Sequence, residues 1–199
     1  MTIAAERTDF AQARKAMIDS QLRVSGVNED WILAAMGREP REDHVPAAAR
    51  EHAYIDRAIP LGQGRALPAP LVHGRMLLEA APAAQDRVLL VGCGSGYLAA
   101  LLGGRVGTLD VIDAAQAASQ TGGMGQHSLL LIDGAIEHLP AGLAAELAEG
   151  GRVVTGLVER GVTRLAIGRK VAGQVSLLAV ADIGIPVLAE FAAPTGWSF

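Results

Sequence analysis

The sequence predicts an α/β fold, in which a parallel sheet follows a helical N-terminal segment and ends in an antiparallel edge. From Asp86 onward, short apolar runs that suit buried strands alternate with helix-forming segments. The first of these runs, DRVLLVG, is continuously apolar, as expected for a parallel strand covered on both faces. Near the C-terminus, three strand-like segments follow one another without helices, which predicts antiparallel neighbours.

Size and charge limit the function classes. A chain of 199 residues, 50% hydrophobic and 19% charged, suits one domain and excludes intrinsic disorder. The formal charge is −4 and the basic residues are scattered, so nucleic acid is not an expected partner. The most membrane-like stretch, residues 88–104, contains five glycines and is too short to span a bilayer, so no membrane association is expected. The single cysteine, Cys93, cannot form an intramolecular disulfide, which favours a cytoplasmic location.

The N-terminal part is expected to be mostly helical. Helix-forming composition predicts a helix over residues 11–22, and Asn28 to Asp30 form a plausible cap for a second helix over 31–36. Three prolines in residues 60–70 predict a loop without regular structure. A further helix is predicted over residues 72–80.

The core is expected to follow in a regular order. After the strand at 86–92 we expect helices at 97–102, 114–120 and from Pro140 to Gly150, and strands at 106–112, 128–132, 152–158, 162–169 and 174–181. Only 14 residues lie between Asp113 and Ser128. Since one parallel crossover needs a dozen residues or more, a single helix should join these two strands, with no further strand between them.

The strongest local motif is a glycine loop placed after the first parallel strand and before a helix. Glycines there allow a tight turn and a close approach of backbone to ligand. The dinucleotide fingerprint would need a third glycine where Tyr97 stands, which disfavours pyrophosphate binding. The G-x-G-x-G spacing instead resembles the loop of class I S-adenosylmethionine-dependent methyltransferases, where the amino-acid end of the cofactor lies against the turn. The loop consists of Gly92, Cys93, Gly94, Ser95 and Gly96.

Acidic residues at the ends of the next strands are the other candidates for cofactor binding. Asp113 lies 21 residues beyond Gly92 and Asp110 lies 18 beyond, near the spacing expected of an acid that holds ribose hydroxyls. Asp113 is preferred, although either acid could instead cap the following helix. Asp133 and Gly134, after the next strand, are expected to line the methyl end of the cleft, unless Asp133 caps the next turn.

The order of segments resembles one family, the protein-L-isoaspartate O-methyltransferases. The runs that carry the resemblance cover roughly residues 12–158 and are MIDSQLRVSGVNEDWILAAMGREPREDHVP, AYIDRAIPLGQGRALPAPLVHGRM, VLLVGCGSGYLAALL and LLLIDGAIEHLPAGLAAELAEGGRVV. The resemblance implies a Rossmann-like class I methyltransferase sheet, S-adenosylmethionine as cofactor, and methylation of the carboxylate of damaged aspartyl residues in proteins and peptides. It also implies two parts: residues 1–80 as a helical segment with the substrate loop, packed on a core of residues 81–199.

The chain departs from the family pattern in two places. Ala66, Leu67 and Pro68 stand where the family usually offers hydroxyl-bearing residues to the substrate. The family's third strand, with the acidic turn that faces adenine, has no counterpart, so we expect weak binding of S-adenosylhomocysteine. These departures leave open a non-catalytic relative that serves as an interaction scaffold, or a methyltransferase with another acceptor.

Few side chains are expected to take part in the chemistry itself. An ionised carboxylate is already a nucleophile, so no general base is needed and no catalytic side chain is assigned. The five histidines lack the spacing of a metal site and are expected at the surface or in turns. Cys93 is expected to be a small apolar filler, and Tyr97 to pack within its helix.

Overall fold

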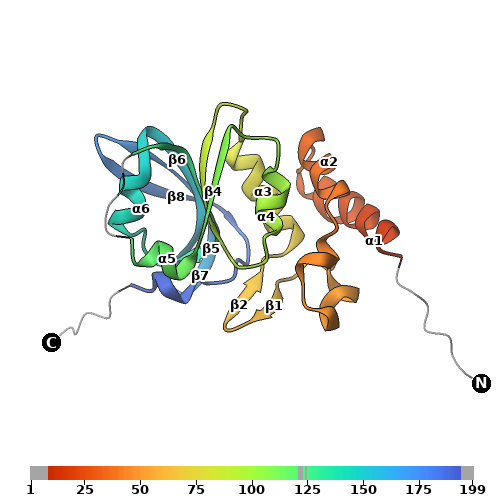
Figure 1. Cartoon of the computed structure of the whole chain (residues 1–199). Helices are drawn as coiled ribbons and strands as arrows, with labels where there is room; N and C mark the ends of the chain where they lie inside the picture. The colour runs from red at the N-terminus through yellow and green to blue at the C-terminus, as the bar shows by residue number, and fades with distance from the viewer. Residues whose placement is uncertain (1–8, 121–122, 124, 194–199) are drawn as a thin grey trace, which may run out of the picture.

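A six-stranded sheet forms the centre of the protein (Figure 1). The structure, a computed structural model, describes residues 9–120, 123 and 125–193. The strands lie in the order β4-β3-β5-β6-β7-β8. Their bounds are β3 Arg87–Gly92, β4 Thr108–Asp113, β5 His127–Ile136, β6 Leu147–Glu159, β7 Val162–Val171 and β8 Gln174–Asp182.

The directions of the strands confirm the predicted fold class. Strand β3 pairs in parallel with β4 on one side and β5 on the other, and β5 pairs in parallel with β6. Strands β6, β7 and β8 are antiparallel neighbours. Ala172 and Gly173 join the last two strands with φ angles of 52° and 78°, the positive values that a tight two-residue hairpin turn requires.

Helices cover both faces of the sheet. On one face lie α3 (Pro70–Ala80) and α4 (Tyr97–Leu102). On the other lie α5 (Ala114–Ala118), α6 (Ala141–Glu146) and the short helix η5 (Ala189–Phe191), as Figure 1 shows. Successive side chains of β3 point alternately into these two layers: Val88 and Leu90 into the first, Leu89 and Val91 into the second.

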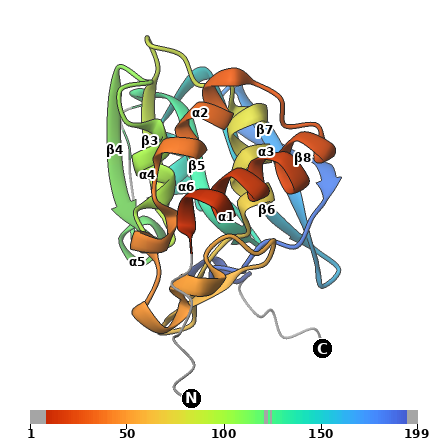
Figure 2. The ribbon, with the colours of Figure 1, turned by 90° about the vertical axis from the view of Figure 1, so that its right-hand side faces the viewer.

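The N-terminal helices form an outer layer over α3 (Figure 2). The expected helix over residues 11–22 is present as α1 and the π-helical turn η1, and the expected helix over 31–36 as α2. The side chains of Leu22 and Val27 pack so closely on Gly74 of α3 that an added Cβ would lie 3.1 Å from Leu22. The bounds of this layer are α1 Phe10–Met17, η1 Ile18–Leu22, η2 Arg23–Ser25, α2 Asp30–Arg38, η3 Arg41–His44 and η4 Ala47–His52.

The expectation of an irregular loop over residues 60–70 is wrong. Strands β1 (Ile59–Gly62) and β2 (Arg65–Leu67) form an antiparallel hairpin there. Pro60 lies opposite Ala66 within it. A ribbon of two strands has an open edge on each side, where a residue without an N–H can be accommodated.

Three predicted ends of core elements are also wrong. Strand β5 continues to Ile136 instead of ending at Asp133, because the ladder with β6 resumes after a register shift between Leu131 and Ala135. Helix α6 ends at Glu146, and β6 begins directly after it at Leu147 rather than at Arg152. The pairing of Leu147 with His127 at the start of β5 supplies the partner that the local sequence could not reveal.

Strand β4 lies at the edge of the sheet. Among the described residues it pairs only with β3, and α5 follows it directly. No described residue between β4 and β5 belongs to a further strand, in keeping with the predicted single-helix crossover. Within the same described ranges, no helix combines the length and apolar character needed to cross a membrane.

Candidate functional site

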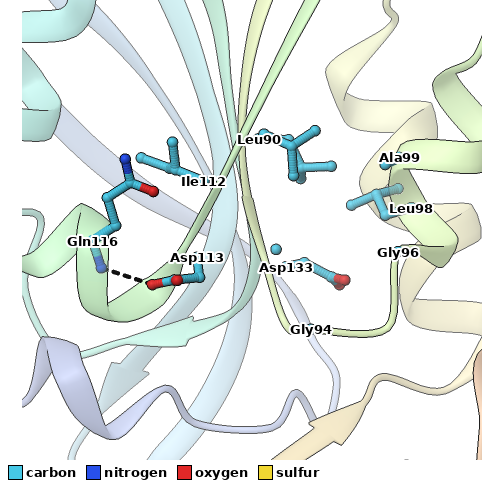
Figure 3. Close-up of a pocket in the computed structure, with 11 residues that line it drawn as sticks. Leu90, Gly94, Gly96, Leu98, Ala99, Ile112, Asp113, Gln116 and Asp133 are labelled. Carbon is cyan, nitrogen blue, oxygen red and sulfur yellow. Dashed lines mark hydrogen bonds between the residues drawn. The ribbon is translucent and has the colours of Figure 1, made fainter.

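A cavity of about 380 Å³ opens at the carboxyl ends of β3 and β4 (Figure 3). This is the place where open parallel sheets bind ligands, and the volume lies within the range of small-molecule sites. Asp113 and Gln116 lie on the side of α5, and Asp133 lies toward α4. The lining consists of Leu90, Gly92, Gly94, Gly96, Leu98, Ala99, Val111, Ile112, Asp113, Gln116 and Asp133.

The glycine loop supplies backbone rather than side chains to this cavity. Gly94 and Gly96 have φ angles of +97° and +75°, which side chains of L residues rarely allow. The two residues between the glycines are turned to other contacts: Cys93 is buried, and the Ser95 hydroxyl accepts a hydrogen bond from the Tyr97 amide at 3.1 Å. The predicted turn is therefore present, with three of its glycines lining the cavity.

The two candidate acids on β4 have different surroundings. Asp113 lines the cavity, and its Oδ1 also accepts a hydrogen bond from the Gln116 amide at 2.7 Å, which caps α5. Asp113 can therefore both cap α5 and hold ribose hydroxyls, the two roles that the sequence left open. Asp110 is not among the residues that line the cavity, and its Oδ2 lies 2.9 Å from Nε2 of His127.

Asp133 lines the cavity from β5, where the ladder with β6 shifts register. Such an irregularity re-aims a side chain that a regular strand would place elsewhere. Its neighbour Gly134 turns away to the C-terminal segment, where an added Cβ would lie 2.5 Å from Cγ of Leu188. The structure thus brings Asp133, but not Gly134, to the glycine loop.

Asp133 is part of a buried polar chain that crosses three elements. His73 of α3 is fully buried, with Nε2 at 2.9 Å from Oδ1 of Asp133 and Nδ1 at 3.2 Å from Nη1 of Arg41. A guanidinium can only donate, so Nδ1 of His73 accepts and Nε2 carries the proton that is donated to Asp133. The neutral form of His73 therefore satisfies both neighbours.

The pKa shifts of this chain agree with that assignment. Burial, the largest influence, lowers the pKa of His73, and the charge of Arg41 acts in the same direction. Burial alone would raise the pKa of Asp133, but the contributions of His73, Cys93 and Arg41 outweigh it and the pKa is lowered. Burial raises the pKa of the Cys93 thiol. The cavity is therefore lined by an ionised carboxylate, and the thiol stays protonated.

Three rings pack together behind the glycine loop, those of Tyr97, His44 and His73. The ring of Tyr97 is fully buried, and its centre lies 4.9 Å from the guanidinium carbon of Arg41 and 5.3 and 5.4 Å from the ring centres of His44 and His73. Nδ1 of His44 lies 3.0 Å from the Ser95 carbonyl oxygen. Tyr97 thus packs in the interior, as expected, and anchors the loop to the N-terminal layer.

The residues predicted for the substrate loop lie in and after β2. Leu67 is fully buried, Ala66 is half-buried, and the Pro68 carbonyl accepts a hydrogen bond from Nη2 of Arg41. None of the three is among the residues that line the cavity.

Sequence reasoning missed several residues around this site. The expectation that all five histidines lie at the surface or in turns is wrong for His73, which is fully buried in α3, and for His127, which is buried at the start of β5. Neither Arg41 nor His73 carries a local signal that predicts burial, because each is compensated by a partner distant in the chain. Arg65, which contacts the glycine loop from β2, was missed for the same reason.

The comparisons with known proteins agree with one another. Residues 12–117 match the family described as "Protein-L-isoaspartate(D-aspartate) O-methyltransferase (PCMT)". A protein-L-isoaspartate O-methyltransferase of Koribacter versatilis is 33% identical over 198 residues, covering 87% of this chain and 89% of its own. One from Roseiflexus castenholzii is 34% identical over 170 residues, covering 73% of this chain and 78% of its own.

Solved structures show the same fold. A Plasmodium falciparum protein, described as a protein-L-isoaspartate O-methyltransferase and crystallised with S-adenosyl-L-homocysteine, superposes with a TM-score of 0.69. It is 17% identical, and the match covers 92% of this chain and all of the other. A second protein-L-isoaspartate O-methyltransferase gives a TM-score of 0.66 at 13% identity, covering 90% of this chain and 67% of its own.

Proposed function

The chain belongs to the protein-L-isoaspartate O-methyltransferase family, and on that premise we propose that its cavity at the carboxyl ends of β3 and β4 binds S-adenosylmethionine and carries out methyl transfer to isoaspartyl carboxylates. The protein is an enzyme of the methyltransferase class, and isoaspartyl-containing proteins and peptides are its substrate class. The observation that carries the assignment of the site is the meeting of the glycine loop, Asp113 and Asp133 around one cavity.

The residues present fit the cofactor. Gly94 and Gly96 line the cavity without side chains, and their positive φ angles form a turn that residues with a Cβ rarely adopt, so backbone can approach a ligand there. Of the two carboxylate oxygens of Asp113, Oδ1 accepts a hydrogen bond from the backbone N–H of Gln116, and Oδ2 has no partner among the described residues. Oδ2 can therefore accept hydrogen bonds from the ribose hydroxyls. The ionised Asp133 favours the positively charged end of the ligand by charge attraction.

The chemistry needs little from the protein beyond placement. When bound, S-adenosylmethionine supplies an electrophilic methyl group, and the acceptor carboxylate attacks it without losing a proton. The work of the chain is therefore to hold the reactants in line and to exclude water. The buried chain of Arg41, His73 and Asp133 keeps the Asp133 carboxylate fixed and ionised beside the glycine loop.

The adenine end of the site offers few polar groups. Edge strand β4 presents Ile112 and Val111, which is 51% exposed, and helix α5 adds Gln116 to the cavity lining. In the part of the chain that the structure describes, no strand with a polar turn lies beyond β4 to contact the base. We therefore expect S-adenosylhomocysteine to bind on the order of a hundredfold more weakly than to a complete site, since each missing polar contact costs about tenfold or more.

The cellular setting belongs to the same proposal. We place the enzyme in the cytoplasm because its one cysteine, Cys93, is buried and unpaired. A formal charge of −4 is unfavourable for nucleic acid, which supports protein and peptide acceptors.

The first test is methyl transfer from labelled S-adenosylmethionine to two peptides that differ only in an isoaspartyl or an aspartyl linkage. The isoaspartyl peptide should be methylated and the aspartyl peptide should not. Transfer to neither peptide, together with no detectable binding of S-adenosylhomocysteine at millimolar concentration, would favour a scaffold without activity. Equal methyl transfer to both peptides would show that the isoaspartyl carboxylate is not the specific acceptor.

The second test assigns the ribose-binding acid by calorimetric titration with S-adenosylhomocysteine. Asp113→Asn keeps an acceptor for the Gln116 amide, so it preserves the cap of α5 and removes only the charge. Loss of charge-assisted hydrogen bonds should weaken binding by about tenfold or more. Asp110→Asn, on the same strand but outside the cavity lining, is the matched control and should bind like the original protein. An equal loss in both variants would overturn the assignment.

A further inference from the structure

An arginine of the hairpin lies across the glycine loop. The Arg65 side chain lies beside Gly94, where an added Cβ on this glycine would be in ordinary van der Waals contact with Cδ of Arg65, at 3.6 Å. Nη2 of Arg65 donates to Oε1 of Glu190, in the C-terminal helix η5, at 2.6 Å. Both side chains are largely shielded, with 22% and 27% of their surface exposed. A hairpin and a C-terminal segment that are distant in the sequence therefore meet through a charged pair beside the glycine loop.

The guanidinium of Arg65 is only partly satisfied by this pair. Nη1 is buried and has no hydrogen-bond partner among the residues that the structure describes. Buried polar groups are normally paired, so such a donor needs an explanation. A guanidinium presents a fork of donors that matches a carboxylate with two parallel bonds. Glu190 engages one arm of this fork through one oxygen, so an acceptor carboxylate that replaces Glu190 can engage both arms.

We propose that Arg65 binds the acceptor carboxylate, and that Glu190 engages Arg65 when no acceptor is present. This inference rests on the proposed function, which makes the acceptor a carboxylate. Arg65 is not among the residues that line the cavity, so the cofactor proposed for that cavity leaves its guanidinium available to the second reactant. Its position beside Gly94 places that reactant next to the cavity at the glycine loop.

The charges change in a way that suits both binding and release. One oxygen of the acceptor carboxylate bonds to the methyl carbon, while the bond from that carbon to sulfur breaks and its electron pair stays on sulfur. The anionic carboxylate and the cationic sulfonium become a neutral ester and a neutral thioether, and no proton moves. The ester no longer offers Arg65 an anion, whereas Glu190 still does. Glu190 therefore competes with the substrate before transfer and displaces the product after it.

Binding of a labelled isoaspartyl peptide, measured by fluorescence anisotropy with saturating S-adenosylhomocysteine, tests this role directly. A matched peptide carries a carboxamide in place of that carboxylate. The original protein should bind the carboxylate peptide about tenfold or more tightly, as a charge-assisted bond implies. Arg65→Gln should abolish this preference, Arg65→Lys should keep part of it, and Glu190→Gln should tighten binding of the carboxylate peptide. Arg23→Gln is the control at an exposed position outside the hairpin, and it should leave the preference for the carboxylate peptide unchanged.

Turnover supplies a second measurement that a merely structural role would not reproduce. Arg65→Gln should raise KM for the peptide and leave KM for S-adenosylmethionine unchanged. A carboxylate preference that persists in Arg65→Gln, or a loss of cofactor affinity instead, would overturn the inference, and unchanged peptide affinity in Glu190→Gln would overturn the competition. Methyl transfer by the original protein decides the proposed function separately, because the anisotropy measurement needs no turnover.

Discussion

The buried His73 should make the stability of the folded protein depend on pH near neutrality. His73 is fully buried between Arg41 and Asp133, and burial lowers its pKa from the ordinary value of 6.5. Below pH 6.5 the unfolded chain binds a proton at this ring and the folded chain does not. Falling pH therefore favours the unfolded state, and the free energy of unfolding decreases as the pH drops.

The magnitude follows from the linkage between proton binding and folding. As long as His73 stays neutral in the folded protein, each pH unit below 6.5 removes about 1.4 kcal/mol of stability. Between pH 7.5 and 5.5 the contribution of this residue is thus about 1.4 kcal/mol, because above pH 6.5 both states are neutral. Asp133 and Asp86, whose pKa values are also lowered, act only in more acidic solution.

The measurement is urea unfolding at pH 7.5, 6.5 and 5.5, comparing the original protein with His73→Gln. A glutamine can accept from Arg41 and donate to Asp133 but does not titrate, so the variant should lose about 1.4 kcal/mol less over this interval. The exposed His52, changed to Gln, is the matched control and should keep the original slope. Equal pH dependence in the original protein and His73→Gln would refute the neutral, buried state of His73.

Two further predictions concern stability. Gly134→Ala should destabilise the fold by about 1–3 kcal/mol in thermal unfolding, because its Cβ would lie 2.5 Å from Cγ of Leu188; a shift below about 0.5 kcal/mol would contradict such tight packing. Arg152→Met should raise the pH at which acid unfolds the protein. Burial opposes ionisation of Asp86, but the hydrogen bonds and charge of Arg152 help to lower its pKa from 3.8 to about 2, so this stability is present above pH 3.8 and is lost as the pH falls toward 2. An unchanged acid-unfolding midpoint would show that Ser128 and the Ala83 amide suffice.

Local patterns were sufficient to predict the order of the core elements and the glycine loop. The continuous apolar run of β3 identifies a strand buried on both faces, and it is paired in parallel on both sides. The spacing between Asp113 and β5 left room for one helix, and α5 is the helix found there. These predictions succeed because periodicity and chain length act within short stretches of sequence.

The boundaries of strands were decided by their partners. Strand β6 begins at Leu147 because His127 of β5 pairs with it there, and β5 passes Asp133 because Ala135 pairs with Gly156. The hairpin that contains Pro60 exists because β2 supplies its second strand. No local composition specifies such pairings.

The sequence alone therefore determined the α/β order, the glycine loop and the acids that follow its strands, because each depends on neighbouring residues and on spacing. Only the tertiary structure decided which charges meet. His73 and Asp133 are 60 residues apart, and Arg65 and Glu190 are 125 apart. A buried ionisable group is stable only beside its partner, and that partner is brought to it by the packing of distant elements.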